Sequence, residues 1–198
     1  MERYLRTTLL GREDLSRGLD ALAVRLAPRL EGREVTVIPI LGGALIFAAD
    51  LMRRLPPGLV LDFLRIQTYG DAQSPQRTAV ADWKPHPENV RGRTVLLLDD
   101  ILDTGRTMTE AKRLLLEDFG AAEVIVVVLI DKPVRRAAGI EADDRVLLLE
   151  EDLFLVGYGL DLAGRFRNLP ELQALTPREQ VAGPGADGAH QREAGAGP

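Results

Sequence analysis

The sequence predicts an α/β fold in which a parallel sheet is flanked by helices. Two apolar runs, residues 95–98 and 124–130, are continuous rather than alternating, as expected of strands covered on both faces. Segments with helical spacing lie at residues 44–55, before these runs, and at residues 107–118, between them. Ligands of such sheets bind at the carboxyl ends of the strands, so the polar residues that follow these runs are candidates for function.

The other elements are predicted from the same patterns. Leucines recur at three- and four-residue intervals from Leu15 to Leu30 and predict an amphipathic helix, which Pro28 is expected to end early. Short apolar runs closed by turn residues predict five strands, at residues 35–41, 59–68, 94–98, 123–130 and 145–149.

One domain and a tail are expected from a chain of 198 residues. Residues 176–198 contain five Gly, three Pro and five Ala without an apolar period, a composition typical of disorder. We therefore expect an ordered domain at residues 1–175 followed by a disordered tail.

Composition and charge exclude several classes of protein. No segment approaches the ~18 uninterrupted apolar residues of a membrane span, and no apolar segment follows the first residues as in a secretory signal. A cytoplasmic protein without a membrane partner is therefore expected. The formal net charge of -5 argues against a nucleic-acid partner. The absence of cysteine excludes disulfides, thiolate nucleophiles and cysteine-bound zinc.

The strongest functional pattern begins where the strand 94–98 is predicted to end. Asp99 and Asp100 are adjacent carboxylates, which suit paired hydroxyls or a hydrated Mg²⁺ ion. Asp103 follows, and a turn with Gly105 and two threonines opens a helix. Free N–H groups at a helix start, a glycine and hydroxyls suit a phosphate monoester. The segment therefore offers places for both a phosphate and sugar hydroxyls.

Three other interpretations fit parts of this segment. An acidic turn in which Thr104 or Thr107 caps the helix would need no ligand. A P-loop needs Gly-x-x-x-x-Gly-Lys-Ser/Thr, which the chain lacks. A phosphoaspartyl phosphatase expects Asp-x-Asp-x-Thr, whereas Asp100 and Asp103 are one residue too far apart. The acidic turn is the alternative that spacing leaves open.

The segment from Asp99 to Thr107 resembles the phosphoribosyl-diphosphate signature of the type I phosphoribosyltransferases. Further segments resemble the hypoxanthine-guanine branch of that family in the same order, at residues 62–70, 129–133, 156–161 and 166–170. The resemblance covers residues 5–175. It implies the type I phosphoribosyltransferase fold, with a small hood formed from about residues 1–12 and 150–175.

The resemblance implies an enzyme of purine salvage. A ring nitrogen of hypoxanthine or guanine displaces pyrophosphate from C1 of phosphoribosyl diphosphate and gives IMP or GMP. Direct displacement fits a chain with no cysteine and no histidine in a motif. Asp103 is implied to be the catalytic residue, as a general base or charge-stabilising group near the purine N7. Asp99 and Asp100 take the ribose hydroxyls, and five residues hold the 5′-phosphate: Asp103, Thr104, Gly105, Arg106 and Thr107.

Pyrophosphate is implied to bind at the loop after the first strand. Gly42 and Gly43 resemble the glycines whose backbone amides receive it, and Arg167 resembles the guanidinium that clamps its oxygens. Leu41 stands where the family commonly has a basic side chain. Pyrophosphate is therefore expected to depend more on the backbone and on Arg167.

The base site is implied at the end of the fourth strand and in the hood. Lys132 donates to the purine O6, Phe154 stacks on the base and Leu155 offers a backbone carbonyl. An ammonium only donates, so the 6-amino group of adenine would face it donor to donor, and 6-oxopurines are the expected substrates. Thr68 and Tyr69 resemble the start of a mobile loop, continuing to Asp82, that closes over the site and excludes water.

Mg²⁺ is the cofactor that the resemblance implies, with Asp99, Asp100 and Asp161 as ligands, and a homodimer or homotetramer is the implied assembly. Two alternatives remain open. One is a nucleotide-sensing regulatory protein on the same fold that contacts RNA, which the negative charge and Asp103 disfavour. The other is a xanthine-preferring phosphoribosyltransferase, because the residues do not fix the preference among hypoxanthine, guanine and xanthine.

Overall fold

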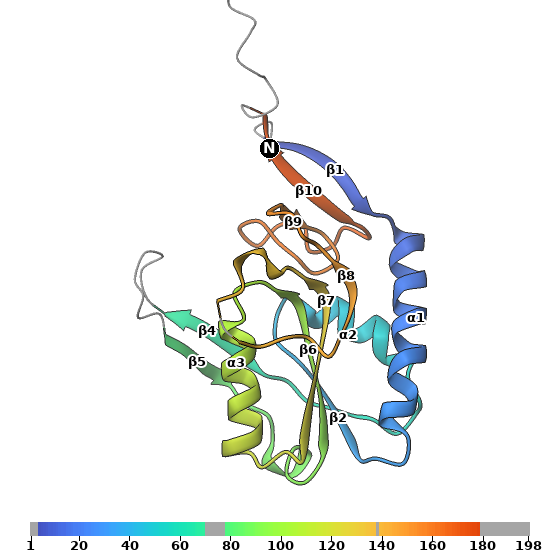
Figure 1. Ribbon diagram of the computed structural model, residues 1–198, viewed down its shortest axis with the longest axis vertical. Helices are drawn as coiled ribbons and strands as arrows, with labels where there is room; N and C mark the ends of the chain where they lie inside the picture. Colours follow the sequence, from blue (N-terminus) through green and yellow to red (C-terminus); the bar gives the residue numbers. More distant parts are fainter. Residues whose placement is uncertain (1–3, 70–77, 138, 179–198) are drawn as a thin grey trace, which may run out of the picture.

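A five-stranded parallel sheet forms the centre of the protein, in strand order β3-β2-β6-β7-β8 (Figure 1). The structure is a computed structural model and describes residues 4–69, 78–137 and 139–178. The strands of this sheet are β2 (Val35–Pro39), β3 (Val60–Leu61), β6 (Thr94–Leu102), β7 (Glu123–Asp131) and β8 (Asp144–Leu148).

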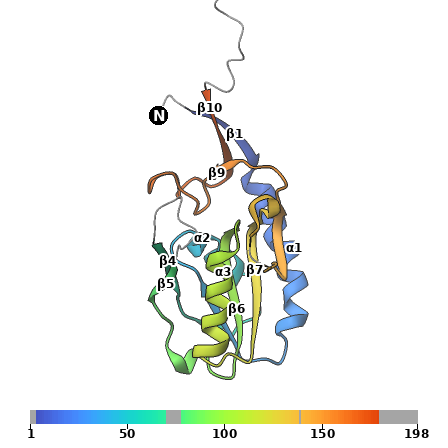
Figure 2. The same cartoon turned by 60° about the vertical axis from the view of Figure 1, so that its left-hand side comes forward.

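Helices cover both faces of the sheet, with α1 (Arg12–Leu30) and α2 (Ala44–Met52) on one face and α3 (Arg106–Arg113) on the other (Figure 2). Alternate residues of one strand reach the two layers. Leu96 and Leu98 pack with α1 and α2, whereas Val95 and Leu97 pack with α3. Burial of both faces explains the continuous apolar runs, and the predicted α/β class is confirmed.

A second sheet lies beyond the carboxyl ends of the parallel strands (Figure 1). It has the antiparallel order β1-β10-β9 and consists of β1 (Tyr4–Leu10), β9 (Phe154–Val156) and β10 (Leu172–Pro177). These strands come from the two segments for which a hood was predicted, and β10 continues two residues past the predicted end of the ordered domain. Residues 179–198 of the predicted tail lie outside the described residues.

The prediction of a single strand at residues 59–68 is wrong. β3 ends at Leu61, and β4 (Arg65–Tyr69) pairs instead with β5 (Thr78–Trp83) in a separate two-stranded sheet. Asp62 holds the turn between β3 and β4, because its carboxylate accepts three hydrogen bonds of 2.7–2.8 Å, from Phe63 N, His86 N and Asn89 Nδ2.

Two helices also differ from expectation. α1 continues through Pro28 to Leu30, because the buried Leu26 and Leu30 hold its last turn against the core. The segment predicted as one helix at residues 107–118 is α-helical only to Arg113, and Leu114–Asp118 is π-helical. Two short 3₁₀ turns complete the fold, at Pro87–Asn89 and Pro133–Arg135.

Candidate active site

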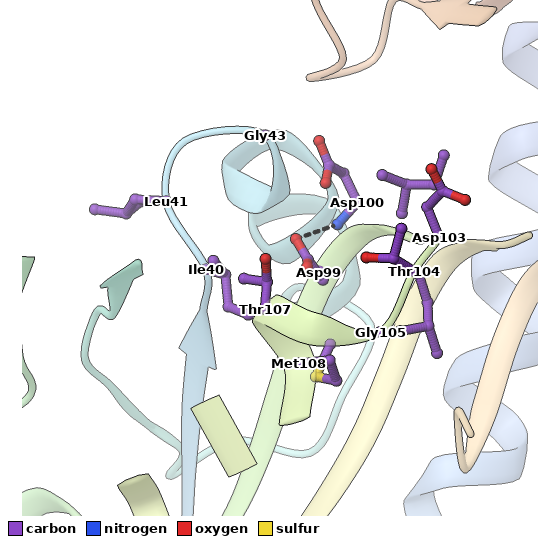
Figure 3. Close-up of a pocket in the computed structure, with 12 residues that line it drawn as sticks. Ile40, Leu41, Gly43, Asp99, Asp100, Asp103, Thr104, Gly105, Thr107 and Met108 are labelled. Carbon is purple, nitrogen blue, oxygen red and sulfur yellow. Dashed lines mark hydrogen bonds between the residues drawn. The ribbon is translucent and has the colours of Figure 1, made fainter. Parts of the chain in front are cut away.

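Asp99 and Asp100 lie in the last part of β6, which continues four residues past its predicted end to Leu102. Pairing with β7 extends as far as Asp131 and keeps this segment in the sheet. Asp99 is buried, and its Oδ1 accepts a hydrogen bond from the backbone N–H of Asp100 at 3.0 Å (Figure 3). The two carboxylates are therefore held by the sheet and not by a loop.

Burial dominates the electrostatics of this acidic pair. Loss of hydration raises the pKa of Asp99 well above its ordinary value, and the neighbouring Asp100 carboxylate raises that pKa further. Burial also raises the pKa of Asp100, although its hydrogen bonds and the nearby Arg167 guanidinium oppose the shift. A bound cation or a pair of hydroxyl donors would stabilise the ionised forms.

The turn after β6 opens α3 without a side-chain cap. Gly105 precedes the helix with φ 82°, a left-handed conformation that glycine adopts readily. No side chain makes a capping hydrogen bond at this helix start, so the alternative in which Thr104 or Thr107 serves as a cap is wrong. The first backbone N–H groups of α3 lack an intrahelical acceptor, which suits an anion.

A cavity of about 280 Å³ lies where the ends of β2 and β6 meet the start of α3 (Figure 3). Gly42 and Arg106 do not line it. It brings together seven predicted site residues: Gly43, Asp99, Asp100, Asp103, Thr104, Gly105 and Thr107. The implied sites for phosphate and ribose thus form one cavity.

Gly43 allows the loop after β2 to approach β6 closely. A Cβ atom at this position would stand 1.7 Å from Oδ2 of Asp100. The loop also meets Gly159 (φ +105°), where a Cβ atom would stand 2.1 Å from the carbonyl oxygen of Gly43. The Leu41–Gly42 peptide bond is cis, and the Leu41 side chain points away from the acidic pair (Figure 3).

A second cavity, of about 380 Å³, shares Asp100, Ile101 and Asp103 with the first. Asp103 therefore lies between the two cavities, and its Oδ1 is buried with no hydrogen-bond partner among the described residues. Such unpartnered buried groups are rare outside functional sites. Besides the shared Asp100 and Asp103, four further predicted site residues line the second cavity: Lys132, Phe154, Leu155 and Asp161.

Phe154 and Leu155 contribute to this second cavity in different ways. Phe154 is 52% exposed, so its ring is not a core side chain and one face is available for stacking. Leu155 is buried and paired with Ala174 of β10. The hood therefore supplies one free aromatic ring and one fixed backbone segment.

Lys132 directly follows β7, and its side chain is buried. Its Nζ donates to Asp152 Oδ1 at 2.6 Å and to the carbonyl oxygen of Leu153 at 3.0 Å. Asp152 also lines the second cavity and was not predicted from the sequence. It is the last of three consecutive acids, a pattern typical of a solvated surface, so no sequence signal marks it.

Asp161 and Arg167 form an ion pair of 2.6 Å. Arg167 also donates to the carbonyl oxygen of Gly159 at 2.6 Å. The structure therefore pairs Asp161 with Arg167 and does not gather it with Asp99 and Asp100 as a ligand set. Within the described part of the chain, no group of three or more His, Asp or Glu residues is placed to hold a metal ion.

Arg136 is a further residue that the sequence did not single out. Its nearly buried guanidinium pairs with Asp131 at 2.5 Å. It also donates to three backbone carbonyl oxygens at 2.8–2.9 Å, those of Leu102, Asp103 and Ile140. Arg136 thus fastens the turn that carries Asp103 to the segment that carries Lys132.

Thr68 and Tyr69 end β4, and residues 70–77 of the predicted mobile loop lie outside the described residues. The last part of that predicted loop forms β5 and pairs with β4.

No helix in residues 4–69, 78–137 or 139–178 is long and apolar enough to cross a membrane.

A family model described as "Phosphoribosyl transferase domain" matches residues 9–162. The chain therefore belongs to the phosphoribosyltransferase family. It is 34% identical over 180 residues to the hypoxanthine-guanine phosphoribosyltransferase of Bacillus subtilis, covering 89% of this chain and 97% of the relative. It is 35% identical over 177 residues to the bifunctional protein TilS/HprT of Listeria innocua, again covering 89% of this chain but only 27% of that relative's length.

Solved structures agree with the sequence comparison. A hypoxanthine phosphoribosyltransferase from Staphylococcus aureus superposes with a TM-score of 0.81 and 31% identity, covering 87% of this chain and 92% of that one. The resemblance on which the sequence analysis relied, including its hypoxanthine-guanine branch and its type I fold, is confirmed.

Proposed function

We propose that the protein transfers the phosphoribosyl group of phosphoribosyl diphosphate to hypoxanthine or guanine. The relatives it matches are named as phosphoribosyltransferases for hypoxanthine or for both bases, which supports the proposal. The observation that carries this proposal is the position of Asp103 between two adjoining cavities. One cavity has hydroxyls and a helix start suited to a phosphorylated sugar, and the other has an exposed aromatic ring and an ammonium suited to a purine.

The cavity of about 280 Å³ offers a place for each part of the phosphorylated sugar. The first N–H groups of α3 with Thr104 and Thr107 bind the 5′-phosphate, while Asp99 and Asp100 accept hydrogen bonds from the ribose hydroxyls. Pyrophosphate lies against the loop at Gly42 and Gly43 and near Arg167, which is close enough to affect the pKa of Asp100. C1 of the sugar then lies toward the second cavity.

Asp103 acts on the base. Its buried Oδ1 has no hydrogen-bond partner among the described residues, so it is available to accept the proton of the purine N7 as N9 attacks C1. An ionised carboxylate would also stabilise the positive charge that develops on the sugar. Lys132 donates to the 6-oxo group, and Phe154 stacks on the ring.

Mg²⁺ fits the acidic pair. Neither Asp99 nor Asp100 takes part in an ion pair among the described residues, and loss of hydration raises the pKa of both carboxyl groups. Mg²⁺ is commonly held by one or two carboxylates together with substrate oxygens and waters, so a third protein ligand is not required. Bound there, the ion would neutralise the leaving pyrophosphate. Asp161 contributes by orienting Arg167.

The test is one panel in which each purine base is supplied with phosphoribosyl diphosphate and Mg²⁺, and nucleotide and pyrophosphate are both followed. Product from hypoxanthine or guanine, with adenine a very poor substrate, supports the proposal. Product from xanthine alone would establish the xanthine-preferring enzyme, and no product from any 6-oxopurine would favour the nucleotide-sensing regulator. A cytoplasmic location and a homodimer or homotetramer remain predictions.

A further inference from the structure

The ammonium of Lys132 has two of its three donors committed within the protein. Nζ donates to Asp152 Oδ1 and to the carbonyl oxygen of Leu153, and the hydrogen bonds of the described residues give it no third acceptor. The Lys132 side chain is only 6% exposed, while the second cavity runs along it. One N–H group is therefore left for a ligand, and its direction is set by the other two.

Asp152 is itself held in place from the opposite side. Its Oδ2 accepts hydrogen bonds from Nε and Nη2 of Arg135, at 2.9 and 2.5 Å. Arg135 therefore holds one carboxylate oxygen while Lys132 holds the other, so that the two cations together fix the orientation of the carboxylate. Arg135 belongs to the 3₁₀ turn directly after Lys132, whereas Asp152 lies between β8 and β9. Both cations lower the pKa of Asp152, so the carboxylate is ionised at neutral pH.

The ion pair between Asp152 and Arg135 is too exposed to stabilise the folded protein appreciably. The side chains of Arg135 and Asp152 are 57% and 40% exposed, and ion pairs of this kind contribute little to folding. The contact with the buried Lys132 is different, because an ammonium in a buried site keeps one orientation only while its acceptors remain. Loss of the carboxylate would leave Leu153 as the single acceptor and allow Nζ to swing.

We infer that Asp152 is a positioning residue that aims the Lys132 ammonium into the base cavity and thereby sets the preference for a 6-oxo over a 6-amino purine. The inference rests on the proposed function and deepens it. A fixed N–H donor forms a hydrogen bond with a 6-oxo group and is repelled by the N–H groups of a 6-amino group. An ammonium that can turn away binds the 6-oxo purine less tightly and excludes the 6-amino purine less strongly.

The test compares the binding of IMP and AMP to one folded sample by calorimetry, so that a general loss of affinity cancels in the ratio. The wild-type protein is expected to prefer IMP, and Asp152→Ala, which removes both carboxylate oxygens, to reduce the preference by about 10-fold, the size of a lost hydrogen bond to a charged group. In turnover, the KM for hypoxanthine should rise by a similar factor while the KM for phosphoribosyl diphosphate stays within about twofold.

Two control variants separate this role from a general charge effect. Glu151→Gln removes the adjacent exposed acid and should leave the IMP to AMP ratio unchanged. Arg135→Gln keeps the contact between Lys132 and Asp152 and should reduce the ratio much less than Asp152→Ala does. An equal loss in Arg135→Gln and Asp152→Ala, or an unchanged ratio in Asp152→Ala, would overturn the inference. A wild-type protein that does not prefer IMP would instead contradict the proposed function.

Discussion

The carboxylate of Asp100 occupies the space that a side chain at Gly43 would need, with Oδ2 only 1.7 Å from the position of a Cβ atom. Gly43 lies in the loop between β2 and α2, whereas Asp100 lies in β6. The missing side chain at Gly43 therefore leaves room for the acidic pair on β6 to face the cavity. Because the obstacle is the end of a side chain, a methyl group there would displace the carboxylate and leave the fold intact.

Gly43→Ala is therefore expected to impair catalysis far more than stability. Displacement of Asp100 by about 1 Å should lower kcat/KM for phosphoribosyl diphosphate by roughly 100-fold, while Tm changes little. Gly11→Ala is the matched control, because Gly11 has an ordinary φ of -73° and a Cβ atom there would make a normal contact of 3.7 Å. A large fall in Tm with unchanged kinetics would contradict the assignment.

Asp103→Asn should lower kcat by at least ~100-fold, the usual size of general-base catalysis, with only modest changes in substrate KM. The amide has nearly the same shape but cannot take the proton that the purine nitrogen releases. Steady-state kinetics with hypoxanthine measures this. The exposed Asp118→Asn should retain full turnover, and near-normal turnover in Asp103→Asn would rule out the role given to this residue.

Arg136→Gln should destabilise the protein by about 3 kcal/mol, because it leaves the buried Asp131 with a single, more exposed partner, Arg145. Arg33→Gln breaks the exposed pair with Glu123 and should cost less than about 1 kcal/mol. Urea unfolding of the two variants gives both values. Equal losses would mean that the guanidinium of Arg136 does not fasten the turn at Asp103.

The sequence predicted those parts of the fold that depend on local pattern. The continuous apolar run of β7 (Glu123–Asp131) implied a strand buried on both faces, and the Thr-Gly-Arg-Thr turn at residues 104–107 indicated the start of a helix with free N–H groups. The break of the strand predicted at residues 59–68 was not predictable, because Asp62 is held by His86 and Asn89, which lie 24 and 27 residues away. Contacts between distant segments have no signature in a local window.

The same limit applies to the candidate site. Asp99, Asp100 and Asp103 were identified because they are contiguous with a strand and a helix start. Asp152 and Arg136 were not, since their roles depend on contacts with Lys132 and with the turn at Asp103 that only the folded chain creates. Motifs therefore identified the residues that are proposed to meet the substrate, whereas the residues that hold them in place depend on contacts between distant segments of the folded chain.

Asp99→Asn is expected to stabilise the ligand-free protein at neutral pH. Burial raises the pKa of Asp99 above its ordinary 3.8, so the folded chain holds this proton to a higher pH than the unfolded chain does. The folded state then binds more protons, and stability falls as pH rises from about 3.8 through the raised pKa. An uncharged amide avoids this loss of stability.

Urea midpoints measured in EDTA from pH 4 to pH 8 should therefore be higher for Asp99→Asn than for the wild-type protein, by a difference that grows with pH. Asp118→Asn should show no such difference. A variant less stable than wild type throughout that range would mean that the buried carboxylate supports the fold as well as the reaction.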